Sequence, residues 1–176
     1  MKTKRLSAFI LLVCVFAVGV FLLSACGNDL PDNTEGVTIR LIVLDGEGAE
    51  LYNKEQLTYK SALADAFIEF EGLNVKGTSS YLGLFITSVE IGTLMLIEDS
   101  EWGNYEMFVA DKTLEPAGYD EFIAVYHDID DINYKWIPIA TYAHDGKTFF
   151  SSGLGVSFLP LFDGATYMLT LETYGG

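Results

Sequence analysis

The sequence predicts a single α+β domain in which one main helix packs on a mostly antiparallel sheet. Three observations lead to this fold class. In residues 37–44 every second residue is apolar, as in a strand, and in residues 61–70 the apolar residues recur every three or four positions, as in a helix. The chain after residue 81 then divides into many short β-branched or aromatic segments. Strands, one helix and a further run of strands form the order typical of an α+β fold.

The domain begins with a predicted hairpin. Val37, Ile39, Leu41 and Val43 alternate with residues of mixed polarity, which predicts a strand over residues 37–44. The Asp and Gly residues at 45–48 favour a turn. Residues 49–52 are therefore expected to return as a short strand.

The main helix is expected over residues 61–70. Leu63, Ala66, Phe67 and Phe70 fall on one face at spacings of three and four residues. Gly72 follows as a natural C-terminal stop. This apolar face needs a sheet to cover it.

The rest of the sheet is predicted from short segments that Gly, Asp, Asn or Pro residues separate. These segments are rich in β-branched and aromatic residues, which favour strands. They cover residues 84–91, 93–97, 105–110, 122–126, 135–142, 148–151 and 166–174.

The N-terminal segment has the layout of a secretory signal. Basic residues precede an almost wholly apolar stretch from 8 to 23, and Leu23-Ser24-Ala25-Cys26 resembles a lipobox. The resemblance implies a signal peptide over residues 1–25, a lipidated Cys26, and a flexible tether over residues 26–36. The mature protein is then anchored to the outer face of the bacterial cell membrane. An uncleaved transmembrane anchor is the alternative.

Composition excludes several classes of protein. The chain has 10 Lys and Arg against 25 Asp and Glu; three of the basic residues precede Cys26, which leaves seven and a net charge of −18 after the cleavage point. Nucleic acid is excluded as a partner because no basic cluster exists to bind phosphates. The two cysteines, Cys14 and Cys26, both lie in the N-terminal segment. The domain therefore has no disulfide, thiolate metal site or cysteine nucleophile.

A strand followed by a DG-type turn, and then four further segments in order, carry a resemblance to a known family. The four segments are residues 61–66, 80–89, 105–109 and 155–167. Together they resemble the bacterial lipoproteins whose domain is similar to the C-terminal domain of transcobalamin. The resemblance implies a β-grasp-like domain over residues 37–176 that caps a cobalamin-like ligand. The chain departs from the family at Glu106 and at Ala110-Asp111, where members often carry Trp and an Asn-Gly turn.

A search for catalytic or metal-binding motifs yields little. His127 and His144 are each followed by an aspartate, but no nucleophile elbow or H-E-x-x-H helix accompanies them. Asp128, Asp130 and Asp131 invite a calcium interpretation, yet the EF-hand pattern fails, and a solvated acidic loop is favoured. We therefore expect no enzyme activity, no cofactor and no metal site, and whether the 128–131 loop binds a cation stays open.

Aromatic residues are the remaining functional signal. Several lie in or beside loops that could form one rim, and planar rings suit a macrocycle or a partner protein. The candidate ligand-binding residues are Trp102, Tyr105, Trp136, Tyr142 and Phe149. The favoured prediction is a monomeric lipoprotein that binds a cobalamin-like or other vitamin-like molecule for an importer. The alternative is a cell-surface protein–protein or adhesion module without a small-molecule ligand.

Overall fold

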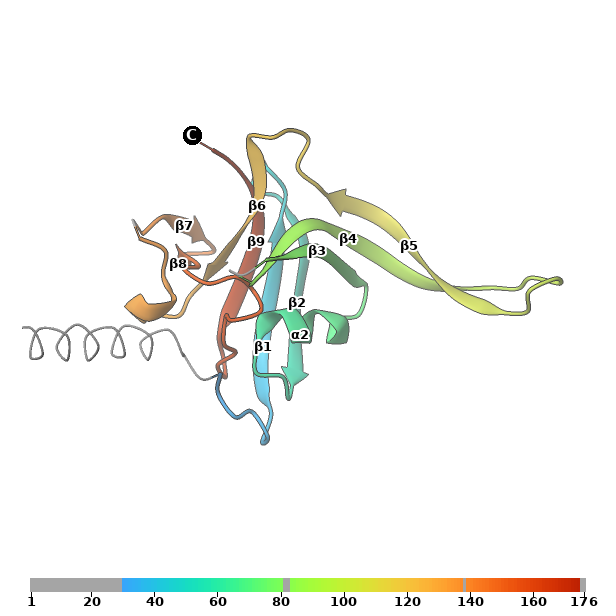
Figure 1. Ribbon diagram of the computed structural model, residues 1–176, viewed down its shortest axis with the longest axis horizontal. Helices are drawn as coiled ribbons and strands as arrows, with labels where there is room; N and C mark the ends of the chain where they lie inside the picture. Colours follow the sequence, from blue (N-terminus) through green and yellow to red (C-terminus); the bar gives the residue numbers. More distant parts are fainter. Residues whose placement is uncertain (1–29, 81–82, 138, 175–176) are drawn as a thin grey trace, which may run out of the picture.

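The computed structural model describes residues 30–80, 83–137 and 139–174, so the predicted signal peptide and Cys26 lie outside the described residues. Two sheets make up this part of the chain (Figure 1). The strands are β1 (Val37–Leu44), β2 (Glu50–Thr58), β3 (Leu73–Ser80), β4 (Gly83–Ile97), β5 (Tyr105–Leu114), β6 (Glu121–His127), β7 (Thr141–His144), β8 (Lys147–Ser151) and β9 (Thr166–Thr173). None of the helices in the described ranges is long and apolar enough to cross a membrane.

The prediction of an α+β, β-grasp-like fold with one main helix is wrong. Strands make up 55% of the structure and helices 7%. The expected helix consists of one α-turn, α2 (Leu63–Ala66), followed by a 3-10 turn, η1 (Phe67–Glu69). The first N–H groups of α2 donate to the carbonyls of Val156 and Leu159 rather than to a capping side chain. Hydrogen bonds to distant backbone carbonyls thus take the place of an N-terminal side-chain cap. The α-helix itself ends after one turn.

The apolar stripe of this segment is nevertheless buried. Leu63, Ala66, Phe67 and Phe70 are all buried, and they belong to the larger hydrophobic cluster. A spacing of three and four residues describes a short α-turn joined to a 3-10 turn as well as it describes a long helix. The pattern therefore identifies the buried face correctly but overestimates the length of the helix.

The larger sheet has six strands in the order β2-β1-β9-β6-β8-β7. The neighbouring strands β1 and β9 are parallel, with Arg40 opposite Thr166, and the other pairs are antiparallel. The predicted return strand at 49–52 is in fact the longer β2. Of the strand expected at 135–142, the described residues retain only the isolated bridge at Lys135 and the start of β7.

The smaller sheet has the order β3-β4-β5. Sequence reasoning left residues 73–80 unassigned, and it divided β4 into two strands at Gly92. The chain instead continues through Gly92 with a β-bulge against β5. A Cβ at Gly92 would lie 1.9 Å from the carbonyl oxygen of Val109, so only glycine allows the two backbones to approach this closely.

Two hydrophobic clusters occupy opposite faces of the six-stranded sheet. The larger cluster lies between this sheet and the α2–η1 segment with the smaller sheet, and it includes Leu41, Phe67, Val89 and Tyr167. The smaller cluster comprises Ile42, Leu44, Ala124, Tyr126, Phe149 and Met168, with Phe122 and Tyr142 packed against it. The β7–β8 hairpin therefore covers the second face. Within the described residues, which begin at residue 30, no member of either cluster precedes Val37.

Part of the expected tether packs on the domain. Asn33 is buried, and its amide donates hydrogen bonds to the carbonyls of Lys60 (2.7 Å) and Leu161 (3.1 Å). The segment is thus attached to the folded domain at Asn33, while residues 30, 32, 34 and 35 are exposed, and residues 26–29 lie outside the described residues.

Candidate functional site

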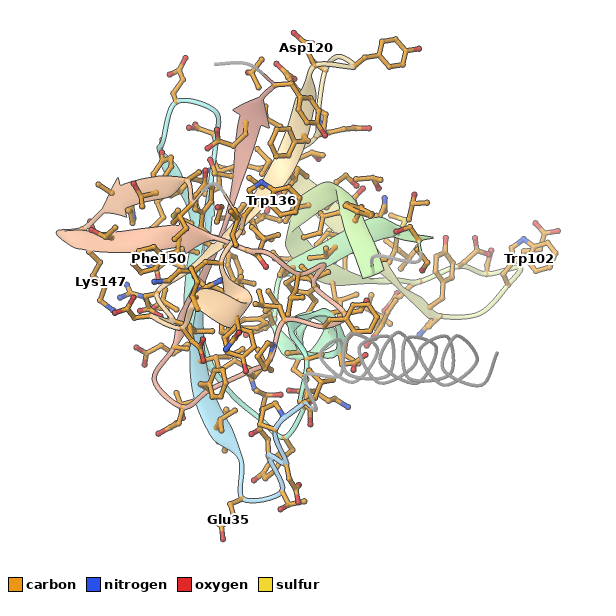
Figure 2. All side chains as sticks on the ribbon, turned by 60° about the vertical axis from the view of Figure 1, so that its left-hand side comes forward. Glu35, Trp102, Asp120, Trp136, Lys147 and Phe150 are labelled. Carbon is orange, nitrogen blue, oxygen red and sulfur yellow. The ribbon has the colours of Figure 1, made fainter. Side chains whose placement is uncertain are left out.

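The five predicted ligand-binding residues do not form one rim. Trp102 and Tyr105 lie at the far end of the β4–β5 hairpin, whereas Trp136 lies between β6 and β7, and Figure 2 shows the two tryptophans far apart. Tyr142 packs against Tyr126 with ring centroids 5.7 Å apart, and Phe149 is buried in the smaller cluster. Two of the five residues are therefore parts of the core. A cobalamin-like ligand stays a prediction.

The most conspicuous surface feature is a projecting β-ribbon, formed by residues 92–97 of β4 and 105–110 of β5. The ribbon is the distal part of the smaller sheet and extends beyond β3, away from the six-stranded sheet (Figure 1). Its apolar side chains are exposed to an unusual degree: Leu94 by 67%, Leu96 by 61% and Trp102, in the turn, by 81%. Met95, Tyr105 and Met107 are also exposed. Contiguous exposed apolar groups of this kind mark interaction sites.

Both faces of the ribbon are apolar. Cross-strand partners share a face, and Met95 pairs with Met107 while Ile97 pairs with Tyr105. On the opposite face, Leu94 pairs with Phe108 and Leu96 with Glu106. A strand with one solvated face would alternate apolar and polar residues, whereas most side chains on both faces of this ribbon are apolar.

The ribbon also has free edges. The pairing of β3 with β4 ends at Leu73 and Ile91, and β5 is an edge strand. Within the described residues, the distal part of the ribbon is therefore two-stranded. A two-stranded ribbon is marginally stable in water without further contacts, so this one is suited to a partner that covers it.

Acidic residues surround the ribbon's turn. Residues 92–109 include Glu98, Asp99, Glu101 and Glu106 and no Lys or Arg. Asp99 Oδ1 accepts hydrogen bonds from the backbone N–H groups of Glu101 (2.7 Å) and Trp102 (2.9 Å). The backbone donors of Trp102 and then Glu101 hold the pKa of Asp99 below its usual range. The tip is therefore negatively charged throughout the neutral and mildly acidic range.

A shallow pocket lies elsewhere, on the six-stranded sheet. Its volume is about 140 Å³, and Thr38, Arg40, Glu55, Lys147 and Thr166 contribute to its lining. Pockets for drug-sized ligands typically measure about 300–1,000 Å³, so this one has room for a small ion or a few waters. None of the five predicted aromatic residues lines it.

The first histidine motif is structural. His127 is fully buried, and its Nε2 lies 2.8 Å from the carbonyl oxygen of Tyr134. Burial lowers the pKa of His127, with a smaller opposing effect from its hydrogen bond to Tyr134. Asp128 Oδ1 accepts from the Thr166 N–H (2.8 Å), and its Oδ2 pairs with Lys147 (3.2 Å). His127 and Asp128 therefore connect neighbouring segments of the fold and do not form a reactive site.

The carboxylates of the 128–131 loop are likewise engaged within the protein. Asp130 forms an ion pair with Lys135, and Asp131 accepts hydrogen bonds from the backbone and side chain of Asn133. Their ligand atoms do not converge in the described part of the chain.

The second histidine lies near two carboxylates. His144, Asp145 and Glu50 place their ligand atoms within 4.8 Å of one another. Sequence reasoning identified His144 and Asp145 as a pair but missed Glu50, which is 94 positions away in the chain and carries no local signal. It also missed the ribbon, although the run Leu94-Met95-Leu96-Ile97 lacks the polar alternation of a half-solvated strand.

Comparisons with known proteins identify no family. No family model matches the chain, and no curated protein matches it. Among solved structures, one similar chain is described as a "putative metal binding protein" from Ruminococcus gnavus ATCC 29149. The two chains share 17% sequence identity at a TM-score of 0.47, and the match covers 78% of this chain and 97% of the other.

Proposed function

We propose that this protein is a lipoprotein anchored through Cys26 to the outer face of the bacterial cell membrane, where it binds a partner protein through the β4–β5 ribbon. The exposure of apolar side chains on both faces of the ribbon is the observation that carries the proposal. The basic, apolar and small-residue order ending at Cys26 supports export and anchoring.

The chemistry of the ribbon specifies its partner. A projecting element that is apolar on both faces is best covered by a cleft, because a flat surface would contact only one face. The four acidic residues of segment 92–109 favour Lys and Arg at the rim of that cleft. The partner is therefore a protein with an apolar groove and a basic rim.

Two other occupants are disfavoured by charge. A second copy of the mature chain would bring together two acidic ribbons in molecules whose net charge after Cys26 is −18, because seven Lys and Arg face 25 Asp and Glu there. Insertion into a bilayer would require Glu98, Asp99 and Glu101 to approach anionic headgroups, and burial of such a charge costs about 2.5–3.5 kcal/mol at the bilayer centre.

Anchoring is tested by the change Cys26→Ser in the full chain. The thiol is the predicted lipid attachment point, so labelling with a radioactive fatty acid should be lost and the precursor should remain uncut or reach the medium. Labelling that persists in the variant would overturn the lipoprotein assignment.

Partner binding is tested by a photo-crosslinking amino acid placed at Leu96 in cells. The matched control is Ile68, an equally apolar residue exposed by 83% on η1 and absent from the ribbon. We expect one protein to crosslink at Leu96 and not at Ile68. The purified partner should then lose about 30-fold in affinity for Trp102→Ala, the typical loss at an interface hot spot of about 2 kcal/mol.

Other crosslinking results would overturn the proposal. Adducts at Leu96 with phospholipid would indicate membrane insertion, and adducts with a second copy would indicate self-association. Saturable quenching of Trp136 fluorescence by a corrinoid, unaffected by Trp102→Ala, would favour the small-ligand alternative instead.

A further inference from the structure

Two turns that are far apart in the sequence come together, although β2 and β7 are the opposite edge strands of the six-stranded sheet. Glu50 begins β2, directly after the β1–β2 turn, while His144 ends β7 and Asp145 occupies the β7–β8 turn. The β7–β8 hairpin reaches this place because Phe149 and Tyr142 pack on the smaller cluster. The approach is close: a Cβ at Gly48 would lie 3.1 Å from the Tyr142 hydroxyl.

The ligand atoms of the three side chains converge. His144 Nε2 lies 3.9 Å from Glu50 Oε2 and 3.7 Å from Asp145 Oδ2. Two ligands on a tetrahedral metal, each bonded at about 2.1 Å, lie about 3.4 Å apart. These two separations exceed this by roughly 0.3–0.5 Å, and the Glu50 and Asp145 oxygens lie within 4.8 Å of each other, so side-chain rotations must bring all three atoms closer to bind one ion.

The imidazole nitrogen at the centre of this group makes no hydrogen bond in the described part of the chain, and the two neighbouring carboxylates can form an ion pair with it only when the ring is protonated. His144 Nε2 is buried, and no hydrogen-bond partner exists for it among the described residues. A buried polar atom left unpaired is costly and calls for an explanation. Because the two nearest groups are carboxylate oxygens beyond hydrogen-bond distance, a cation between the three atoms would satisfy all of them.

A second set of residues holds one carboxylate in place. Asn53 Nδ2 donates to Glu50 Oε2 (2.7 Å), and Arg40 Nε in turn donates to Asn53 Oδ1 (2.7 Å). Metal sites characteristically have such outer hydrogen bonds, which orient the ligating side chain. Glu50 and Asp145 are both exposed and His144 is half-buried, so an ion can reach the site from solvent.

We propose that Glu50, His144 and Asp145 bind a divalent transition-metal ion of the Zn²⁺ type, with water completing the coordination. One imidazole and two carboxylates suit Zn²⁺, whereas Ca²⁺ and Mg²⁺ prefer oxygen ligands alone. The ion would link the β1–β2 turn to the β7–β8 turn and so fasten the hairpin over the smaller cluster. This site is separate from the ribbon and does not depend on the proposed partner.

The test is Zn²⁺ titration calorimetry on the untagged chain from Gly27, which retains both hydrophobic clusters and contains no cysteine. One Zn²⁺ should bind per chain. His144→Ala and Glu50→Gln should each weaken binding at least tenfold, since changes in outer hydrogen bonds alone cost about 10–100-fold in metal affinity. Glu47→Gln is the matched control, because it removes the same charge from the same turn outside the cluster.

A third variant protects the test against a folding defect. Asp145 has a φ of 51° in an Asp-Gly hairpin turn, a conformation that Asn also adopts readily. Asp145→Asn should therefore fold normally, as near-ultraviolet circular dichroism can verify, and still bind Zn²⁺ more weakly. Zn²⁺ should also raise the melting temperature of the unaltered protein and of Glu47→Gln, but not of Glu50→Gln.

Three results would overturn the proposal. They are the absence of stoichiometric Zn²⁺ binding in the unaltered chain, equal affinity in the Glu50 and Glu47 variants, and a Zn²⁺-induced stabilisation that survives His144→Ala.

Discussion

The β7–β8 hairpin and the β4–β5 ribbon are both antiparallel hairpins with aromatic and aliphatic residues. The first buries these side chains, and the second exposes them. The β7–β8 hairpin folds back on the sheet and buries Phe149 with Tyr142 packed beside it. The ribbon projects outward and leaves Leu94, Leu96 and Trp102 in solvent. Apolar content is thus a poor guide to role, because one hairpin completes the core and the other offers a surface to a partner.

The bulge at Gly92 contributes to this difference. It lies where the pairing of β4 with β3 ends and the two-stranded ribbon begins. The Gly92 N–H donates to the carbonyl of Gly72 (3.0 Å), which ties the base of the ribbon to the end of the α2–η1 segment. β8 leaves the edge of β6 after two paired residues, Ser151 and Phe150, and the Ser152 N–H that follows donates to the carbonyl of Val125 (2.8 Å).

The largest expected effect comes from truncating the buried hairpin. Phe149→Ala should lower the free energy of unfolding by about 3–5 kcal/mol, because it opens a cavity in the smaller cluster. Urea denaturation followed by circular dichroism measures the change. Trp102→Ala is the contrasting variant and should change stability by less than about 0.5 kcal/mol. Equal losses in the two variants would remove the distinction between the hairpins.

The second prediction concerns the base of the ribbon. Gly92→Ala should cost about 1–3 kcal/mol, because its Cβ would overlap the Val109 carbonyl and force the strands apart. Partner binding should fall with it, since the ribbon would change direction. Gly46→Ala is the control, where the nearest atom to a new Cβ is 3.7 Å away. A fully stable Gly92→Ala protein would show that the bulge does not hold the ribbon.

The third prediction uses pH to lower the free energy of unfolding through His127, which lies beside β8, while leaving the ribbon unchanged. Burial lowers the pKa of His127, which pairs with Phe150 of β8. Below about pH 6.5 the unfolded chain therefore binds more protons than the folded one, and stability falls as the pH falls, by up to about 1.4 kcal/mol per pH unit.

Denaturation midpoints from pH 7.5 to 5 measure this slope, and His127→Gln should flatten it. Segment 92–109 has no histidine, and the lowered pKa of Asp99 keeps that carboxylate charged in this range. Ribbon binding in the folded protein should accordingly be insensitive to the same change in pH. An unaltered slope in His127→Gln would assign the pH response to another group.

The smallest stability effect is expected on the ribbon surface. Leu94→Ser should alter the free energy of unfolding by no more than about 0.5 kcal/mol, because the side chain is 67% exposed. It should nevertheless weaken partner binding, which surface plasmon resonance measures. A large loss of stability would indicate that the ribbon supports the fold.

Several elements were predictable because their signal is local. The alternation from Val37 to Val43 and the strand-forming segment at 166–173 correspond to β1 and β9, which lie side by side in the larger sheet. The stripe of Leu63, Ala66, Phe67 and Phe70 is buried as its spacing indicates. β3 was not predictable in this way, because residues 73–80 are mostly polar and exposed, and pairing with β4 makes them a strand.

The candidate sites likewise contain some residues with a local sequence signal and others that only long-range packing brings in. Of the metal cluster, the adjacent residues His144 and Asp145 were visible as a pair, but Glu50 joins them only because the β7–β8 hairpin folds across the sheet. The aromatic residues were correctly seen as numerous, yet Phe149 is core and Trp102 is solvent-exposed.

The sequence by itself determined the net charge, the lack of cysteine after Cys26, the strand periodicity and the identity of the buried stripe. These properties depend on residue type and on spacings of a few positions. The tertiary structure alone decided that the helix is a single turn, that β4 runs on into an exposed ribbon, and that Glu50 meets His144. Periodicity shows which face of an element is apolar, but long-range packing decides whether another part of the chain covers it.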